Sequence, residues 1–363
     1  MLASYNWLRS LLPGLTASVE EIAERLTRTG LEVEEVITYG AASPHVVIAT
    51  VTKREPHPDR ERLSLVTVDS GSGQQTIVCG APNVPEPGRK VVLASVGTHL
   101  PAVDMTLTPR EIGGIASEGM LCSERELGLV KGASKTDGIM VLPAGFAAAP
   151  GTPLSRAIPA THDFIIDLAV TPNRPDALGH VGIARELATL FGVDFVAPEA
   201  DAPKAVAAGT VEDLASIVVE DTERCPHYGA AVVVDVRVEE SPAWLRYRLE
   251  SLGVRAISNV VDVTNLVLFE YGQPLHAFDL DRLDGGKIVV RRALPKETMT
   301  TLDEVVRTLD GDDLLITDGQ RAVALAGVMG GSDSEVSEDT TRLLLECAHF
   351  SPRGIRRASR RHG

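Results

Sequence analysis

The chain has 363 residues, with 35 Lys and Arg against 50 Asp and Glu, so its formal net charge at pH 7 is −15. This length predicts two or three domains, and a composition of 44% apolar and 23% charged residues excludes a disordered, collagen-like or coiled-coil protein. The acidic balance argues against a protein that coats nucleic acid nonspecifically, although a local basic patch can still bind phosphates.

The sequence also lacks the signals of secreted and membrane proteins. No apolar run approaches the ~18 residues of a membrane span, and the N-terminus has no basic start of the kind found in signal peptides. The four cysteines are scattered without a C-x-x-C pair, so we expect buried thiols and no metal site. These features predict a cytoplasmic protein that does not contact a membrane.

Two helical segments flank a region of alternating pattern. Ser18 and Glu21 form a capping box that begins a helix over 18–30, and helical periodicity returns over 178–192. Between them, residues 45–145 alternate with period two and are interrupted by Gly and Pro, which is typical of short strands. We expect a small β-barrel inserted between two helices that pack together.

The second half of the chain mixes strands and helices without βαβ alternation, so we expect an α+β domain there. Residues 197–210 are rich in Ala, Pro and Gly and have no periodic apolar face, which is typical of a linker. The predicted divisions are a split N-terminal domain of 1–39 with 151–196, a barrel of 40–150, a linker of 197–210, and a final domain of 211–363.

The chain ends in five arginines within nine positions: Arg353, Arg356, Arg357, Arg360 and Arg361. They form either a solvated helix face or a contact to RNA phosphate. The sequence stops without a helix cap, and we therefore expect it to be part of a longer chain.

A basic cluster precedes a predicted strand of the barrel. Its members are Lys53, Arg54, His57, Arg60 and Arg62, of which Lys53, Arg54, His57 and Arg62 are the candidate tRNA-binding residues. Loops that project from a rigid barrel are well placed to bind phosphates. Nearby carboxylates offset the positive charge, so charge alone does not decide whether the cluster binds RNA. Three ordered segments, 57–63, 77–84 and 113–128, resemble the tRNA-binding OB-fold module of aminoacyl-tRNA synthetases and their accessory proteins. The resemblance implies that the cluster binds tRNA.

Polar groups lie beside apolar runs in segments 171–176 and 259–279, which from their chemistry alone are either buried hydrogen-bond networks or sites. The glycine loop of 325–331 is either a tight turn or a cradle for an oxyanion or phosphate. A further segment, 343–352, lies near the end of the sequence. Together with 5–8, these segments resemble the family of bacterial phenylalanine–tRNA ligase β subunits over essentially the whole chain. Members of that family normally continue into further domains, so the resemblance implies that this is the N-terminal half.

The resemblance implies the fold, function and partners. The fold is α+β and multidomain, with an OB-fold barrel inserted into a small helical N-terminal domain and an α+β editing domain after it. The implied partners are tRNA(Phe) and the ligase α subunit, in an α2β2 enzyme, without DNA. Aminoacylation with ATP and Mg²⁺ then occurs on the α subunit, and no cofactor is expected in this chain. The implied activity is hydrolysis of mischarged Tyr-tRNA(Phe).

The same resemblance implies roles for individual residues. Asn265 and His276 match positions near the scissile ester, Gly327 and Gly330 lie in the loop at the pocket, and Glu346 matches the group that recognises the tyrosine hydroxyl. A carboxylate can accept a hydrogen bond from a phenol but gains nothing from a phenyl ring, so Glu346 fits discrimination.

Several alternatives stay open at the level of sequence. His276 either activates water or positions water or the tRNA end. We expect direct attack by water without a covalent intermediate, because no nucleophile set can be assembled. The chain could also be a noncatalytic tRNA-binding or scaffold module, in which case these polar residues form a structural network.

Overall fold

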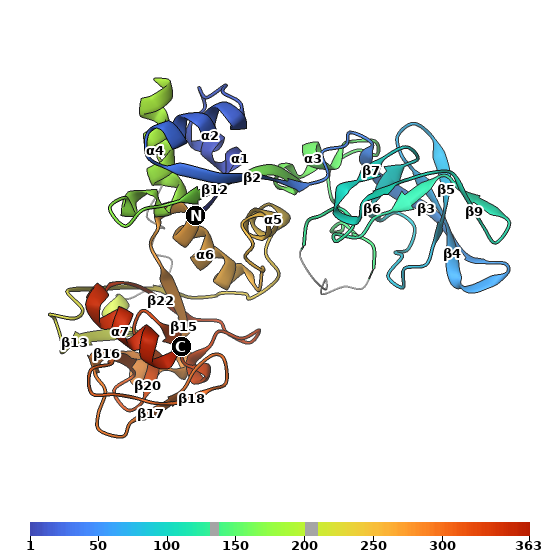
Figure 1. Cartoon of the computed structure of the whole chain (residues 1–363). Helices are drawn as coiled ribbons and strands as arrows, with labels where there is room; N and C mark the ends of the chain where they lie inside the picture. Colours follow the sequence, from blue (N-terminus) through green and yellow to red (C-terminus); the bar gives the residue numbers. More distant parts are fainter. Residues whose placement is uncertain (131–137, 200–209) are drawn as a thin grey trace. The chain divides into compact units, whose positions relative to one another are not determined.

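A computed structural model of the chain describes residues 1–130, 138–199 and 210–363 (Figure 1). The chain divides into two units: Met1–Ala197 with Pro242–Ala256, and Pro198–Ser241 with Ile257–Gly363. Most of the predicted linker of 197–210, namely 200–209, lies outside the described residues. The predicted boundaries mark domains that we expect to fold separately, and in that sense they stay a prediction.

The N-terminal part of unit 1 is a three-stranded sheet with helices. The sheet order is β1-β12-β2, with β1 Leu2–Ser4, β12 His162–Ala169 and β2 Glu32–Gly40, and the helices are α1 Tyr5–Leu11, α2 Val19–Arg28, α3 Leu154–Ala157 and α4 His180–Phe191. The predicted capping box is present, since Ser18 accepts from the Glu21 amide and Glu21 accepts from the Ser18 amide. The two predicted helices are in contact, because the Arg25 guanidinium donates to the Leu190 carbonyl at 3.1 Å.

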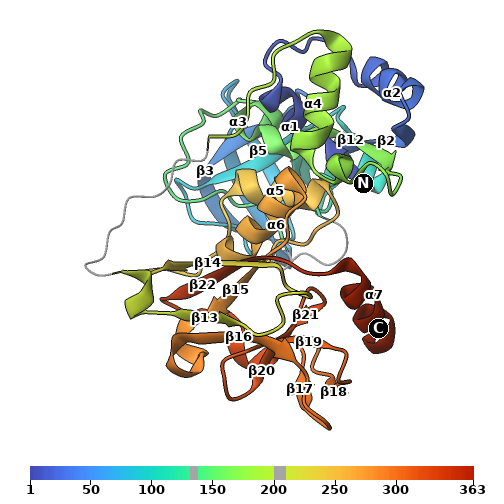
Figure 2. The ribbon, with the colours of Figure 1, turned by 90° about the vertical axis from the view of Figure 1, so that its left-hand side faces the viewer.

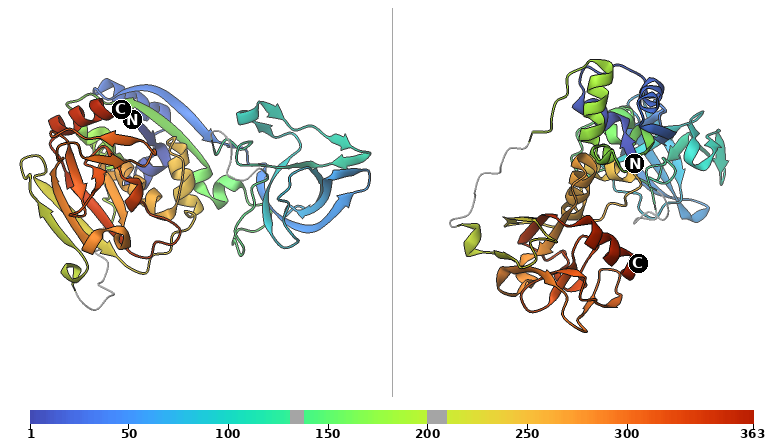
Figure 3. Two further views of the ribbon diagram at one scale, coloured as in Figure 1. Left: turned by 90° about the horizontal axis from the view of Figure 1, so that it is seen from below. Right: turned by 60° about the vertical axis from the view of Figure 1, so that its left-hand side comes forward.

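The second part of unit 1 is a five-stranded antiparallel sheet that nearly closes on itself (Figure 3). Its order is β11-β6-β3-β4-β5, with β3 Val46–His57, β4 Arg60–Asp69, β5 Gln74–Cys79, β6 Lys90–Ser95 and β11 Gly119–Leu121. The Glu118 amide, beside β11, donates to the Thr76 carbonyl of β5 at 3.1 Å, so the two edges meet. Two short hairpins accompany this sheet: β7 His99–Leu100 with β8 Met105–Thr106, and β9 Arg110–Ile112 with β10 Ile115–Ser117.

Alternation explains the interior of this sheet. Val66 and Val68 of β4 face inward with Val51, Val91 and Leu93, and all are almost fully buried. The expected five-stranded barrel is therefore found as a near-closed sheet, and its assignment as an OB fold stays a prediction.

The helix α5, Ala243–Ser251, differs from expectation because it packs within unit 1 rather than with the predicted domain of 211–363. Its anchor is the buried Glu124, which accepts hydrogen bonds from the Arg246 guanidinium at 2.6 Å and the Tyr247 hydroxyl at 2.8 Å. A buried carboxylate requires such partners, and these come from a segment more than a hundred residues away in sequence. Local patterns could not have placed α5.

Unit 2 contains two sheets that form separate layers (Figure 2). One has the order β13-β16-β19-β20-β21, with β13 Ser216–Val219, β16 Lys287–Arg292, β19 Leu314–Thr317, β20 Ala322–Leu325 and β21 Met329–Gly330. The other has the order β14-β22-β15, with β14 His227–Val233, β22 Leu343–His349 and β15 Leu275–Asp279. The hairpin of β17 Thr298–Thr300 with β18 Val306–Thr308 and the helices α6 Asn259–Tyr271 and α7 Pro352–His362 complete the unit.

The core of unit 2 lies between these layers. Phe278 and Leu344 from one sheet pack with Ile288, Ile316 and Val323 from the other, and each is almost fully buried. Among the described residues of this unit, β13 with β16 is the one parallel strand pair, so the unit is mixed α and β without βαβ alternation there. Across 1–130, 138–199 and 210–363, every helix is too short or too polar to cross a bilayer.

Candidate functional site

A cavity of about 230 Å³ opens between the two sheets of unit 2. It brings together four residues that sequence reasoning placed in one site: His276, Gly327, Gly330 and Glu346. The remaining lining is mostly apolar, including Ile316, Leu325 and Phe350. An apolar pocket with a few convergent polar groups is the usual form of a small-ligand site.

His276 and Glu346 are direct neighbours across the antiparallel pair of β15 and β22. Residues opposite each other in such a pair project to the same face, so the imidazole and the carboxyl both face the cavity. The adjacent Cys347 projects to the other face of β22, and it does not line the cavity. The register of two strands therefore creates the polar part of the site.

Glu346 is only 7% exposed, and its carboxylate Oε2 accepts a hydrogen bond of 2.7 Å from the Tyr228 hydroxyl on β14. Burial raises the pKa of Glu346 from 4.5 to about 7, and the Tyr228 bond partly offsets that rise. Burial, with the neighbouring carboxylate, also raises the pKa of Tyr228, so this hydroxyl stays protonated and donates.

The second carboxylate oxygen of Glu346 has no hydrogen-bond partner among the described residues. A carboxylate has two oxygens that can each accept, and Tyr228 occupies one. The other is available to a donor that enters the cavity. Sequence reasoning missed Tyr228, since a single tyrosine in a strand carries no signal for a partner 118 residues away.

His276 is partly buried, and burial lowers the pKa of its imidazole from 6.5 to about 4. Its ring lies edge-on to Phe278, with centroids 4.5 Å apart, and within the described ranges neither ring nitrogen has a hydrogen-bond partner. The imidazole is therefore neutral at pH 7 and has a lone pair that can accept a proton.

The glycines bring the loop after β20 close to these groups. A Cβ at Gly330 would lie 2.7 Å from the His276 Cε1, so a side chain there would displace the imidazole. Gly327 adopts a φ of +64°, and a Cβ there would meet Phe350 and Ile355 at 3.1 Å. At both positions the absence of a side chain lets the backbone lie close to neighbouring side chains, and neither glycine carries a reacting group.

Asn265 is the predicted residue that the structure does not place with the others. It lies on α6, which packs against β15, but it is absent from the lining of the cavity. Its proposed role at the ester stays a prediction. The described residues also contain no cluster of three or more His, Cys, Asp or Glu side chains suited to a metal ion.

The residues of the basic cluster on the five-stranded sheet differ in whether their charges are already paired. Lys53 pairs with Glu55 at 2.8 Å, and Arg54 donates to the Val84 carbonyl at 2.8 Å and reaches Glu86 at 3.4 Å. Arg62 is exposed and has no partner in the part of the chain that the structure describes. Arg60, also in the cluster, is exposed and unpaired among the described residues too, so Arg60 and Arg62 are its two available cations there.

His57, which we expected to bind tRNA, lies in a buried position. It is 4% exposed, its Nε2 lies 3.1 Å from the Ile112 carbonyl oxygen, and its Nδ1 accepts from the Asp59 amide at 3.1 Å. A Cβ at Gly113 would lie 2.5 Å from its ring. With both ring nitrogens engaged, His57 stabilises the turn between β3 and β4, and its contact with tRNA stays a prediction.

Two family models match the chain, the "Putative tRNA binding domain" over residues 46–151 and the "B3/4 domain" over residues 224–363. Curated relatives include the phenylalanine–tRNA ligase beta subunits of Anaeromyxobacter dehalogenans, 49% identical over 100% of this chain, and of Geobacter metallireducens, 45% identical over 100%. The chain spans 44% of the length of each.

A solved N-terminal fragment of the phenylalanyl-tRNA synthetase beta subunit from Pyrococcus horikoshii is 16% identical, and the match covers 53% of this chain and 58% of that one. Its TM-score of 0.30 is too low to carry an argument about the fold. The identity to the curated relatives extends over the entire chain and both matched domains agree with it. By sequence, the chain belongs to the phenylalanine–tRNA ligase beta subunit family.

Proposed function

We propose that this chain binds tRNA(Phe) and hydrolyses the ester of mischarged Tyr-tRNA(Phe), while an α subunit carries out aminoacylation with ATP and Mg²⁺. The observation that carries the proposal is the pairing of His276 and Glu346 on adjacent strands facing one cavity, with one carboxylate oxygen unoccupied. The names of the relatives and the matched domains support the substrate class.

The chemical need for such a site follows from the similarity of the two amino acids. A pocket for phenylalanine rejects an isostere that adds only a hydroxyl by a factor of about 10². A second site that requires the hydroxyl removes the error. In this proposal the free oxygen of Glu346 accepts the tyrosine hydroxyl, and a phenylalanine ring leaves that oxygen unpaired at a cost of about 1–3 kcal/mol.

The hydrolysis itself requires a proton acceptor near the ester. The neutral imidazole of His276 takes a proton from water as the water oxygen bonds to the ester carbonyl carbon. The bond from that carbon to the ribose oxygen then breaks, and the proton is returned to the ribose oxygen. Tyrosine and intact tRNA leave as products, and the histidine is restored.

The test is the deacylation of Tyr-tRNA(Phe) by the purified chain. We expect hydrolysis well above the spontaneous rate, and His276→Ala should slow it by about 10²-fold or more while leaving the preference for Tyr over Phe intact. Binding of tRNA(Phe) without any hydrolysis by the native chain would instead support a noncatalytic tRNA-binding module.

A further inference from the structure

The helix α7 has a buried face that supports the cavity. Ala358 is almost fully buried, and Ile355 lies against Gly327, a lining residue of the cavity. The side chain of His362 contacts the buried Asp313, with 2.7 Å between the imidazole Nε2 and Oδ2. Spacings of three, four and seven place these three residues of α7 on one side of the helix.

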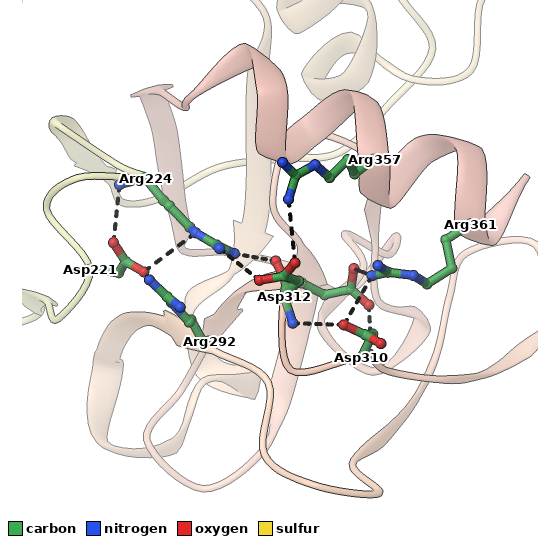
Figure 4. A network of polar contacts seen from close by, with 8 residues as sticks. Asp221, Arg224, Arg292, Asp310, Asp312, Arg357 and Arg361 are labelled. Atoms are coloured by element: carbon green, nitrogen blue, oxygen red, sulfur yellow. Dashed lines mark hydrogen bonds and ion pairs between the residues drawn. The ribbon is translucent and has the colours of Figure 1, made fainter.

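The arginines on one flank of α7 form ion pairs with carboxylates (Figure 4). Arg357 lies 3.4 Å from the Asp312 carboxylate, and Arg361 donates to Asp313 at 2.5 Å and approaches Asp310 at 3.5 Å. These two arginines are therefore occupied within unit 2 and fix the helix to the loop before β19.

The outer face of α7 has a different character. Arg353, Arg356 and Arg360 occupy positions i, i+3 and i+7, which share one side of a helix. All three are exposed, and none has an ion pair or hydrogen bond among residues 1–130, 138–199 and 210–363. We call these three residues the arginine stripe; it is about 10 Å long at 1.5 Å per residue.

The arginine stripe begins next to the cavity. Phe350 lines the cavity, and Arg353 follows it by three residues, so their Cα atoms are at most about 10 Å apart. Three cations without a partner among the described residues lie here, on a chain whose net charge is −15. A surface of this charge beside an ester-sized cavity matches a polyanion whose end enters the cavity.

We propose that the arginine stripe binds the phosphates of the RNA strand that carries the aminoacyl ester into the cavity. The proposal rests on the proposed function, which supplies an aminoacylated RNA end as substrate. Guanidinium groups suit this contact because they donate in a planar fork that matches phosphate oxygens. Arg357 and Arg361 contribute support for the helix instead, since their charges are already paired.

The experiment replaces the arginine stripe by Gln in the full chain, R353Q/R356Q/R360Q, and measures affinity for uncharged tRNA(Phe) across a salt series. Loss of three phosphate contacts should reduce the slope of log K against log salt by about 2 and weaken binding by about tenfold at moderate salt. In deacylation of Tyr-tRNA(Phe), KM should rise by a similar factor with kcat unchanged.

Two matched variants control for folding and for net charge. R353K/R356K/R360K keeps three cations but lacks the planar fork, so it should keep a near-native salt slope and lose less affinity than the Gln variant. R28Q/R156Q/R185Q makes the same charge change at exposed arginines of unit 1 and should leave the salt slope unaltered. A native slope and affinity in the Gln variant, or an equal loss in the Lys variant, would overturn the proposal. Because binding is measured on uncharged RNA, an absence of hydrolysis would count against the proposed function alone.

Discussion

At the scale of single residues, the carboxyl of Glu346 is buried beside a cavity and has a pKa far from its ordinary value. Its pKa rises from 4.5 to about 7 because it is buried, and Tyr228 supplies the one hydrogen bond it receives from the described residues. Placing a carboxylate in such a position costs stability, which is expected of a group retained for binding rather than for folding.

This pKa has a consequence for stability with a definite sign. Between pH 4.5 and about 7 the unfolded chain loses the Glu346 proton while the folded chain keeps it, so the free energy of unfolding falls as pH rises. The loss approaches roughly 3.5 kcal/mol above pH 7, because the pKa rises by about 2.5 and each unit corresponds to about 1.4 kcal/mol. Glu346→Gln keeps an acceptor for Tyr228 and removes the titration.

We therefore expect Glu346→Gln to gain stability relative to the native chain as pH rises from 4.5 to 8, measured by urea unfolding followed by circular dichroism. His276, whose pKa is lowered, contributes a change of opposite sign, but it is present in both proteins and cancels in the difference. A stability difference that stays constant across this pH range would show that the Glu346 carboxyl is not shifted as described.

The sequence singled out residues that sit in distinctive motifs, whereas residues defined by tertiary contacts carry no local signal. Glu346, His276, Gly327 and Gly330 were indicated through the resemblance to a family, and the cavity brings them together. Tyr228 and the burial of His57 depend on strand register and on the approach of Gly113, which no local pattern encodes.

At the scale of elements, α5 shows how a long-range bond decides where a helix belongs. The carboxylate of Glu124 accepts hydrogen bonds from Arg246 and Tyr247. Without these two donors the buried carboxylate would be an unpaired charge. A local pattern of apolar residues in α5 carries no information about which unit the helix packs in.

Glu124→Ala should destabilise unit 1 by about 3 kcal/mol, because it leaves the Tyr247 hydroxyl and the Arg246 guanidinium without their acceptor. Both tryptophans, Trp7 and Trp244, lie in unit 1, so tryptophan fluorescence during urea unfolding reports on this unit. Arg125→Ala, an exposed neighbour, should change stability by less than about 0.5 kcal/mol. Equal stability of the two variants would rule out this anchoring role.

The basic cluster of the five-stranded sheet allows a similar contrast. Arg62→Gln should reduce the salt slope of tRNA(Phe) binding by about 0.7–0.9, since Arg62 is unpaired among the described residues. Lys53→Gln should reduce it less, because Lys53 pairs with Glu55. The joint change of Lys53, Arg54 and Arg62 to Ala should weaken binding most. Unchanged affinity of that triple variant over the salt series would identify the cluster as a solvated surface.

At the scale of the whole molecule, the chain combines a matched tRNA-binding domain with a B3/4 domain in one polypeptide of 363 residues. The identity to curated relatives covers the full chain but 44% of their length, so this polypeptide contains part of the machinery that those relatives carry. We propose that this polypeptide binds tRNA and removes a wrong amino acid from it by hydrolysis of the ester.

The central claim is that Glu346 selects tyrosine by its hydroxyl, and the ratio of deacylation rates for Tyr-tRNA(Phe) and Phe-tRNA(Phe) tests it most directly. The native chain should strongly prefer the tyrosyl ester. At pH 8, above the pKa of about 7 at which Glu346 ionises, Glu346→Gln should lower that ratio roughly 5- to 30-fold, or about 1–2 kcal/mol, because a charge-assisted hydrogen bond becomes a neutral one. Glu346→Ala should bring the ratio close to one while hydrolysis by His276 continues. A native Tyr-over-Phe ratio in Glu346→Ala would contradict the account.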